Sequence, residues 1–155
     1  MLKSLVFMSF LVLVMILPIK LVFSADLDTK LNRVIKSVKK YKIPKTKIDK
    51  IVKAIIQVES NGNRLAKGCA SEKGLMQVLY RTWIWTCEKI LHEDIPWAYG
   101  FNSYYNKRVG TAYLTYLINR YGFEQGVRRY NQGKYWRGRK GQRYYSKIMR
   151  ELKGA

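Results

Sequence analysis

Apolar residues recur at the three- and four-residue steps of a helix in the segment that ends at Ser60. They are Ile48, Ile51, Val52, Ile55 and Ile56, and this spacing places them on one face of a helix over 46–60. Glu59 comes four residues after Ile55 and falls on the same face. The Asn61-Gly62-Asn63 run that follows tolerates left-handed backbone and is expected to end the helix. The segment therefore predicts a core helix with a carboxylate in its last turn.

Helical patterns account for most of the remaining chain. Further helices are expected over 27–41, 82–91, 103–121, 123–130 and 142–152. Pro44 separates the first of these from the helix that carries Glu59. The sequence has no internal repeat, no low-complexity tract and no convincing pair of strands, and residues 79–80 and 93–101 receive no assignment. We predict a mostly α fold in which short links pack the helices around one core, as a compact single domain.

The N-terminal residues have the pattern of an export signal. Lys3 precedes a run from Leu5 to Leu17 without charge, which is short for a membrane span, and Val22-Phe23-Ser24 offers a cleavage site before Ala25. We predict a signal peptide over 1–24, an amphipathic helix over 25–44 and one further domain over 45–152, exported to the periplasm, the cell wall or the medium. An uncleaved anchor is the alternative, because 21–23 extends the apolar stretch past Lys20.

Two cysteines and one histidine limit the metal and redox chemistry of the chain. In an oxidising compartment we expect Cys69 and Cys87 to form a disulfide. In the chain-entropy model such a bond stabilises the folded domain by on the order of 3 kcal/mol. Two buried free thiols are the alternative. His92 is the only histidine, and no group of residues has metal-ligand spacing. We therefore expect no metal and no organic cofactor.

The formal net charge of +20 predicts a polyanionic partner. Nucleic acid is one candidate, because aromatic and basic residues alternate in segments such as 128–130 and 135–140. Export would remove the chain from most nucleic acid, so we expect none as a partner. The bacterial wall offers carboxylates and, in some cells, phosphates, and a polyanionic wall polymer is the expected partner of the basic surface.

Glu59 has the placement of a general acid. A carboxyl on the apolar face of a helix is partly desolvated, which disfavours its charged form and raises its pKa. Its negative charge in the last turn also opposes the helix macrodipole. The alternative is an ordinary helix-end residue that turns out to water.

Five short motifs, taken in their order along the chain, resemble those of a known family. They are Glu59-Ser60, Gly74-Leu75-Met76-Gln77, Asn106 through Gly110 to Tyr113-Leu114, Tyr130-Asn131-Gln132-Gly133, and Tyr144 with Lys147-Ile148. Together they resemble the lytic transglycosylases of the soluble (SLT) type, which are related to goose-type lysozymes. The resemblance covers roughly residues 45 to 150. It implies a lysozyme-like helical fold, with 45–152 as the catalytic domain and peptidoglycan glycan strands as the substrate.

The resemblance also implies how one carboxylate can cleave a glycosidic bond. In that family a single Glu protonates the bond between N-acetylmuramic acid and N-acetylglucosamine. It then acts as base for the muramoyl C6 hydroxyl, which attacks its own anomeric carbon and forms a 1,6-anhydromuramic end. Glu59 would take both roles. Glycosidases usually need two carboxylates, and Glu72 is the acid best placed in sequence to approach Glu59.

Two other functions remain open from the sequence. One is a muramidase on the same fold, although goose-type lysozymes have an acid where this chain has Val78-Leu79-Tyr80. The other is a non-catalytic basic module that binds the wall. Small enzymes that resemble this chain also serve secretion or conjugation machinery, or phage, so such machinery is a further possible partner.

The supporting site residues follow from the resemblance alone. It implies that Ser60 and Gln77 line the cleft, that Gly74 lets the backbone approach the ligand, and that Met76 packs on a sugar ring or, alternatively, fills the core. The remaining implied residues are Tyr130 and Asn131, which contact the N-acetyl group, and Tyr144, whose hydroxyl hydrogen-bonds the acid, with Tyr145 as the alternative match. The family usually has Ala where this chain has Arg129.

Overall fold

The computed structural model describes residues 44–154. The predicted signal peptide over 1–24, and all but the last residue of the amphipathic helix predicted over 25–44, lie outside the described residues. The α-helices of the described part are α2 (Lys45–Ser60), α3 (Tyr80–Thr86), α4 (Ser103–Tyr121), α5 (Phe123–Gln132) and α6 (Arg139–Gly154). Between residues 44 and 154 extended backbone pairs only at isolated bridges around Lys73. The predicted mostly α fold is confirmed.

The helix ends follow from local chemistry. Asn61 adopts a left-handed conformation (φ 50°, ψ 36°) and ends α2, as the Asn-Gly-Asn run predicts. The side chain of Asn102 accepts hydrogen bonds from the backbone N–H groups of Tyr104 and Tyr105 and caps the start of α4. Gly122, with φ 82°, ends α4 and allows α5 to begin directly afterwards.

The segment after α3 differs from the prediction. The helix expected over 82–91 is α-helical only as far as Thr86, and continues as a π-helical turn over Cys87–Leu91. His92 then takes a left-handed conformation. A 3-10 helix over Trp97–Phe101 lies in the region that received no assignment. Contacts between segments override the local pattern here, as where the indole N–H of Trp83 donates to the carbonyl of Ile95.

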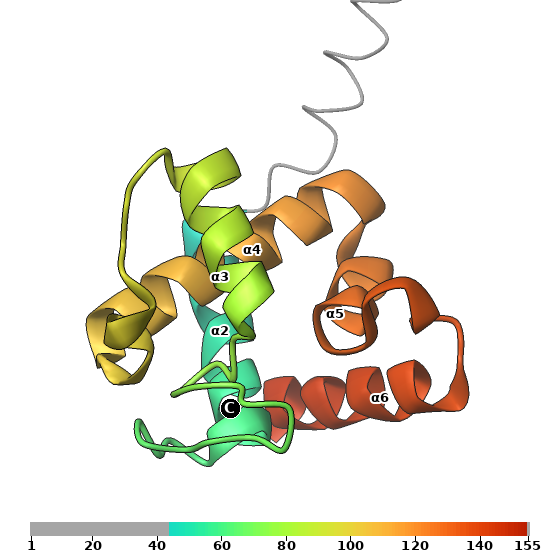
Figure 1. Ribbon diagram of the computed structural model, residues 1–155. Coiled ribbons are helices and arrows are strands. Elements are labelled where there is room, and N and C mark those ends of the chain that lie inside the picture. The colour runs from blue at the N-terminus through green and yellow to red at the C-terminus, as the bar shows by residue number, and fades with distance from the viewer. Residues whose placement is uncertain (1–43, 155) are drawn as a thin grey trace, which may run out of the picture. The chain divides into compact units, whose positions relative to one another are not determined.

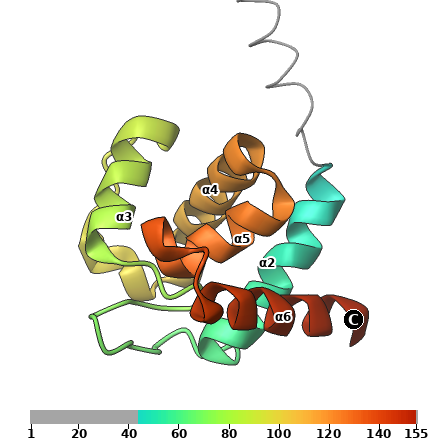
Figure 2. The ribbon, with the colours of Figure 1, turned by 90° about the vertical axis from the view of Figure 1, so that its right-hand side faces the viewer.

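One buried cluster joins all the long helices. Figures 1 and 2 show α4 among the other helices, with α6 passing below α5 and reaching α2. Most of the fully buried members of the cluster come from α2, α3, α4, α5 and α6, and include Ile55, Trp83, Val109, Leu114, Ile118, Val127 and Ile148. Their burial is the main stabilisation of the fold. It also fixes α2 against the end of the long loop that follows, where Leu75, Met76 and Val78 are buried.

Asn106 braces the loop between α2 and α3. Its side chain is fully buried in α4, and its Oδ1 accepts a hydrogen bond of 2.8 Å from the N–H of Met76. Its Nδ2 donates to the carbonyl oxygens of Lys73 and Gly100, each at 2.8 Å. Gly74, with φ 73°, makes this approach possible, since a side-chain carbon there would lie 2.5 Å from Asn106 Nδ2. One amide thus ties three backbone segments together.

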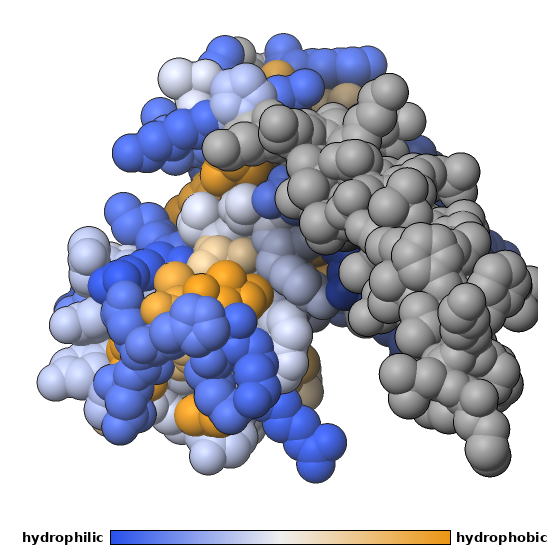
Figure 3. Space-filling model, turned by 90° about the horizontal axis from the view of Figure 1, so that it is seen from above, coloured by the Kyte–Doolittle hydropathy of each residue, from blue (hydrophilic) through white to orange (hydrophobic). Residues whose placement is uncertain are grey.

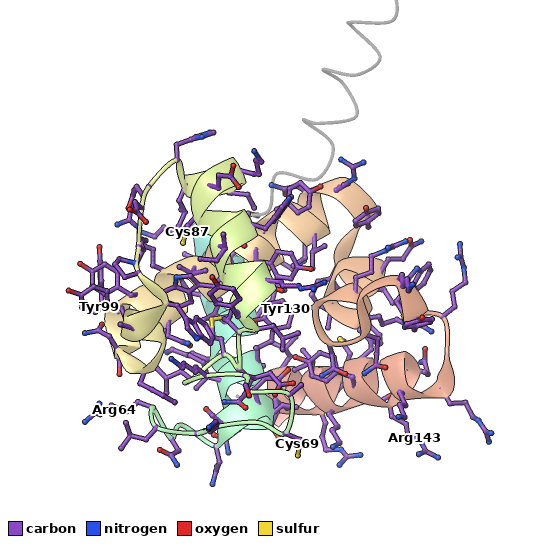
Figure 4. The ribbon with its side chains drawn as sticks, in the orientation of Figure 1. Arg64, Cys69, Cys87, Tyr99, Tyr130 and Arg143 are labelled. Atoms are coloured by element: carbon purple, nitrogen blue, oxygen red, sulfur yellow. The ribbon has the colours of Figure 1, made fainter. Side chains whose placement is uncertain are left out.

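The predicted disulfide between Cys69 and Cys87 is not formed. Both cysteines are free, with Cys69 exposed in the loop and Cys87 buried at the start of the π-helical turn. Figure 4 shows them well apart, with Cys69 near the lower edge of the described domain and Cys87 above it beside α3. A bridge would require their Cα atoms to lie within about 7 Å. The loop is held by hydrogen bonds to Asn106 instead.

The surface of the described domain is largely polar. Hydrophilic side chains cover much of the face seen in Figure 3, and apolar residues show there in limited areas between them. None of the helices within 44–154 has both the length and the apolar character needed to cross a membrane.

Candidate active site

A cleft of about 280 Å³ opens beside the C-terminal end of α2. Its walls come from α2, the loop after it, the start of α3, and the facing sides of α4 and α5. The residues that line it are Glu59, Gly68, Cys69, Glu72, Gln77, Val78, Leu79, Thr82, Tyr113, Tyr130 and Asn131. Four of the residues predicted from the sequence, Glu59, Gln77, Tyr130 and Asn131, are thus brought together, as is Glu72.

Glu59 is a half-buried carboxyl at the inner wall of this cleft. Burial raises the pKa of Glu59 above its ordinary value of 4.5, and this is the largest influence on it. Hydrogen bonding by Tyr144 and Asn131 lowers the pKa, the negative charge of Glu72 raises it, and the positive charge of Lys147 lowers it. The net effect is a raised pKa. A carboxyl of this kind keeps its proton to higher pH than an ordinary glutamic acid, which suits a proton donor.

Tyr144 approaches Glu59 from α6. Its side chain is buried, and its hydroxyl makes no hydrogen bond with the described residues. The hydroxyl nevertheless lies near enough to Glu59 to lower the carboxyl pKa. Burial first, and then the charge of Glu59, raises the pKa of Tyr144 well above its ordinary value of 10. The phenol therefore stays neutral and keeps its O–H proton beside the carboxyl.

Glu72 brings a second carboxylate to the cleft. Its Oε2 accepts a hydrogen bond of 2.9 Å from the N–H of Ala70, within the loop. Its charge acts on Glu59, which shows that the two carboxyls share one electrostatic environment. The sequence expectation that Glu72 approaches Glu59 is consistent with this arrangement.

Three predicted residues hold the loop in shape. The Ser60 hydroxyl donates to the carbonyl of Leu75 at 2.8 Å. The Gln77 amide donates to the carbonyls of Ala66 and Gly74, at 3.0 and 2.8 Å. The Tyr130 hydroxyl, in the middle of the domain in Figure 4, donates to the carbonyl of Met76 at 2.9 Å. Of the three, Gln77 and Tyr130 also line the cleft, whereas Ser60 does not.

Met76 and Gly74 serve the core and not the cleft surface. Met76 has no exposed surface, and its side chain lies against Gly110 of α4, where an added carbon would come within 2.6 Å of the sulfur. A buried side chain offers no face to a sugar ring, so the core alternative holds for Met76. The missing side chain of Gly74 makes room for Asn106 and Gly100, which are groups of the protein itself.

Sequence reasoning missed several cleft residues. Tyr113 received no role from the sequence, yet its half-buried ring lines the cleft and lies 5.7 Å from the ring of Tyr130. Val78, Leu79 and Thr82 also line the cleft. The only sequence feature that could have identified Tyr113 as a cleft residue is its place in one of the five motifs. Leu79 is exposed and Val78 is buried, and no pattern in the sequence separates them.

The chemistry that these residues support is proton transfer at a neutral ligand. Between residues 44 and 154, no three His, Cys, Asp or Glu side chains gather as metal ligands would. The cleft combines a proton donor of raised pKa, amides of Gln77 and Asn131, and the aromatic rings of Tyr113 and Tyr130. Amides and aromatic rings together fit a ligand that carries hydroxyl or acetamido groups on flat apolar faces, such as a sugar.

Comparison with known proteins points to one family. The sequence model of the family described as the transglycosylase SLT domain matches residues 33–152. The match includes α2 to α5 in full, α6 as far as residue 152, and every residue that lines the cleft. A search of curated proteins finds no significant match.

Proposed function

Because the chain belongs to the SLT transglycosylase domain family, it is a lytic transglycosylase of the lysozyme-like superfamily that acts on peptidoglycan, and we propose that Glu59 is its catalytic acid and base. The observation that carries this assignment is the burial of the Glu59 carboxyl in the wall of the cleft. Burial raises the pKa of Glu59, and Tyr144 supplies a neutral phenol beside it.

In the first step Glu59 gives its proton to the oxygen of the β-1,4 bond between N-acetylmuramic acid and N-acetylglucosamine. The bond to the anomeric carbon of the muramic acid breaks, and the N-acetylglucosamine side leaves as an alcohol. Glu59, now ionised, takes the proton of the C6 hydroxyl of the same muramic acid while that oxygen bonds to the anomeric carbon. The product is a 1,6-anhydromuramic end, and the carboxyl is protonated again.

The nucleophile belongs to the substrate, so proximity is provided by the sugar ring itself. A second protein carboxylate is not required for this reaction. Asn131 and the ring of Tyr130 are proposed to hold the N-acetyl group, since both line the cleft beside Glu59. Tyr144 is proposed to position the Glu59 carboxyl, because it reaches that group from α6 without lining the cleft.

The test is mass spectrometry of the fragments that the purified protein releases from peptidoglycan, with Glu59→Gln in parallel. We expect anhydromuramic ends, lighter by one water than hydrolytic ends, and a loss of at least about a thousandfold for Glu59→Gln, because acid and base roles each contribute roughly 10²–10⁴. The variant should still bind insoluble peptidoglycan. Unchanged release by Glu59→Gln would refute the assignment of the acid.

Glu72 supports a second candidate, a muramidase that uses water as nucleophile. It lines the same cleft, and its charge acts on Glu59, which fits a carboxylate that activates water on the opposite side of the sugar. Reducing muramic ends in the same mass spectra, together with a large loss of turnover in folded Glu72→Gln, would establish this function. Anhydromuramic ends with only a small loss would exclude it.

We also propose that the chain is exported to the compartment that contains peptidoglycan, and that wall polymers or a secretion or conjugation machine are its further partners. The charged residue and uncharged run at 3–17 support export. Mass spectrometry of the intact protein, recovered from periplasm or medium, should give a chain that begins at Ala25. Recovery of the full-length chain from the membrane fraction would favour the uncleaved anchor.

A further inference from the structure

Helix α6 exposes a row of cations on the side away from the core. Arg139, Arg143, Lys147 and Arg150 are all exposed and line one shallow groove of about 370 Å³, together with Gln142 and Ser146. Their spacing of four, four and three residues puts them on one face of the helix. The opposite face carries Tyr144 and Ile148, which are buried. Figure 4 shows Arg143 pointing away from the domain.

These cations have no anionic partner within the described chain. The ion pairs between residues 44 and 154 involve Lys89, Arg108 and Arg128, and none involves a residue of α6. Glu151 is the only carboxylate on α6. Like charges four residues apart destabilise a helix, so the row is electrostatically unfavourable in isolation. An anionic ligand along the groove would reverse this effect.

The length of the row selects a polymer over a single small ion. From position 139 to position 150 the helix rises about 16 Å. One carboxylate or phosphate could pair with one or two of these side chains, whereas a chain with repeated anionic groups could pair with all of them. Guanidinium groups bind carboxylates through two parallel hydrogen bonds, and the groove has three of them.

Lys147 links the groove to Glu59 electrostatically. This residue lines the groove, and its charge is close enough to Glu59 to lower the carboxyl pKa. Tyr144, one turn earlier on the same helix, lies beside Glu59 on the buried side. The groove and the Glu59 carboxyl thus lie on two sides of one helix, close enough for the charge of Lys147 to act on the carboxyl. This proximity favours anionic groups of the substrate over those of an unrelated surface.

We propose that the α6 groove binds the acidic peptide stems of the peptidoglycan whose glycan strand occupies the cleft. The inference rests on the proposed function for its choice of polymer. It gives the enzyme a preference for strands that still carry stems with free carboxylates, which adds to the recognition of sugars in the cleft.

The test compares intact peptidoglycan with the same material after its free carboxylates have been converted to amides. The variant is Arg139→Gln with Arg143→Gln and Arg150→Gln, which leaves Lys147 in place. The control is Lys47→Gln with Lys50→Gln and Lys53→Gln on α2, which removes the same charge from other exposed positions. Thermal unfolding verifies that both proteins fold. Binding to the insoluble material is measured in a Glu59→Gln background, and turnover with Glu59 present.

We expect the α6 variant to lose about tenfold in binding and in kcat/KM on intact peptidoglycan. The loss of three exposed charge pairs is enough for a change of this size. On the amidated material it should match the unsubstituted protein, and the α2 control should change little on either. Equal losses on both materials, or equal losses by both variants, would overturn the proposal. So would unchanged binding to peptidoglycan with reduced binding to a phosphate polymer or to anionic lipid vesicles.

Failure of the proposed function would look different from these outcomes. If Glu59 is not the acid, Glu59→Gln retains turnover, while the binding comparison between intact and amidated peptidoglycan still decides whether α6 reads carboxylates.

Discussion

At the scale of single residues, two neighbours shift the pKa of the Glu59 carboxyl in opposite directions. The charge of Glu72 raises the pKa of Glu59, and hydrogen bonding by Tyr144 lowers it. An acid catalyst works while protonated, so activity falls as pH rises through this pKa. We predict that Glu72→Gln moves the falling limb of the kcat/KM profile to lower pH and that Tyr144→Phe moves it to higher pH. Shifts of the same sign in the two variants would contradict this account, and Asp49→Asn, on an exposed part of α2, is the control.

The same burial has a consequence for stability. Because the pKa of Glu59 is higher in the folded than in the unfolded chain, the folded state binds the proton more tightly, and ionisation destabilises it as pH rises. Below about pH 4.5 the carboxyl is protonated in both states and this destabilisation is absent. We predict that Glu59→Gln raises the unfolding temperature at pH 7 and that the gain disappears below pH 4.5. A gain that persists at low pH would point to a different cause.

Some residues of the site could be predicted from the sequence and others could not. Glu59 stood on an apolar helix face, and its burial follows from that period. The positions of Ser60 and Met76 depend on what the loop touches, namely the carbonyl of Leu75 for Ser60 and the side of α4 at Gly110 for Met76. Those contacts join distant parts of the chain, and no local pattern records them.

At the scale of elements, Asn106 holds the loop between α2 and α3. Asn106→Ala would leave the N–H of Met76 and the carbonyls of Lys73 and Gly100 without partners. Each buried unpaired group costs roughly 1–3 kcal/mol, so three such groups predict a loss of at least about 3 kcal/mol in the free energy of unfolding, measured by urea denaturation. Activity should fall further than stability explains, because Gln77 belongs to the same loop. Asn102→Ala, which removes only the cap of α4, should cost about 1 kcal/mol.

The helices themselves were the most predictable elements. The bounds expected for α4 match those observed, because its apolar residues keep a regular period and Gly122 ends it. The π-helical turn at Cys87–Leu91 and the 3-10 helix at Trp97–Phe101 were not predictable. Trp83 donates to the carbonyl of Ile95 at 2.7 Å, and Lys73 lies 4.3 Å from the ring centroid of Trp97. These two tertiary contacts hold that region.

At the scale of the whole molecule, the two thiols report on folding. Cys69 is exposed and Cys87 is buried, and burial raises the pKa of Cys87 above its ordinary value of 9.0, which lowers its reactivity. We predict that the native protein reacts rapidly with one equivalent of a thiol reagent and with a second only after unfolding. A reducing agent should leave the unfolding temperature unchanged. If no thiol reacts in the native protein and the unfolding temperature falls on reduction, the two cysteines are joined in a disulfide and this account is wrong.

The hydrogen bonds that assemble the cleft join residues far apart in the chain. Ser60 reaches Leu75 across 15 positions, Asn106 reaches Met76 across 30, and Tyr130 reaches Met76 across 54. During synthesis the ribosome therefore releases Glu59 long before the helices that complete its surroundings. A chain that stops before α5 has the acid but neither Tyr130 nor Tyr144, so the wall-cleaving site comes into existence only when translation is almost finished.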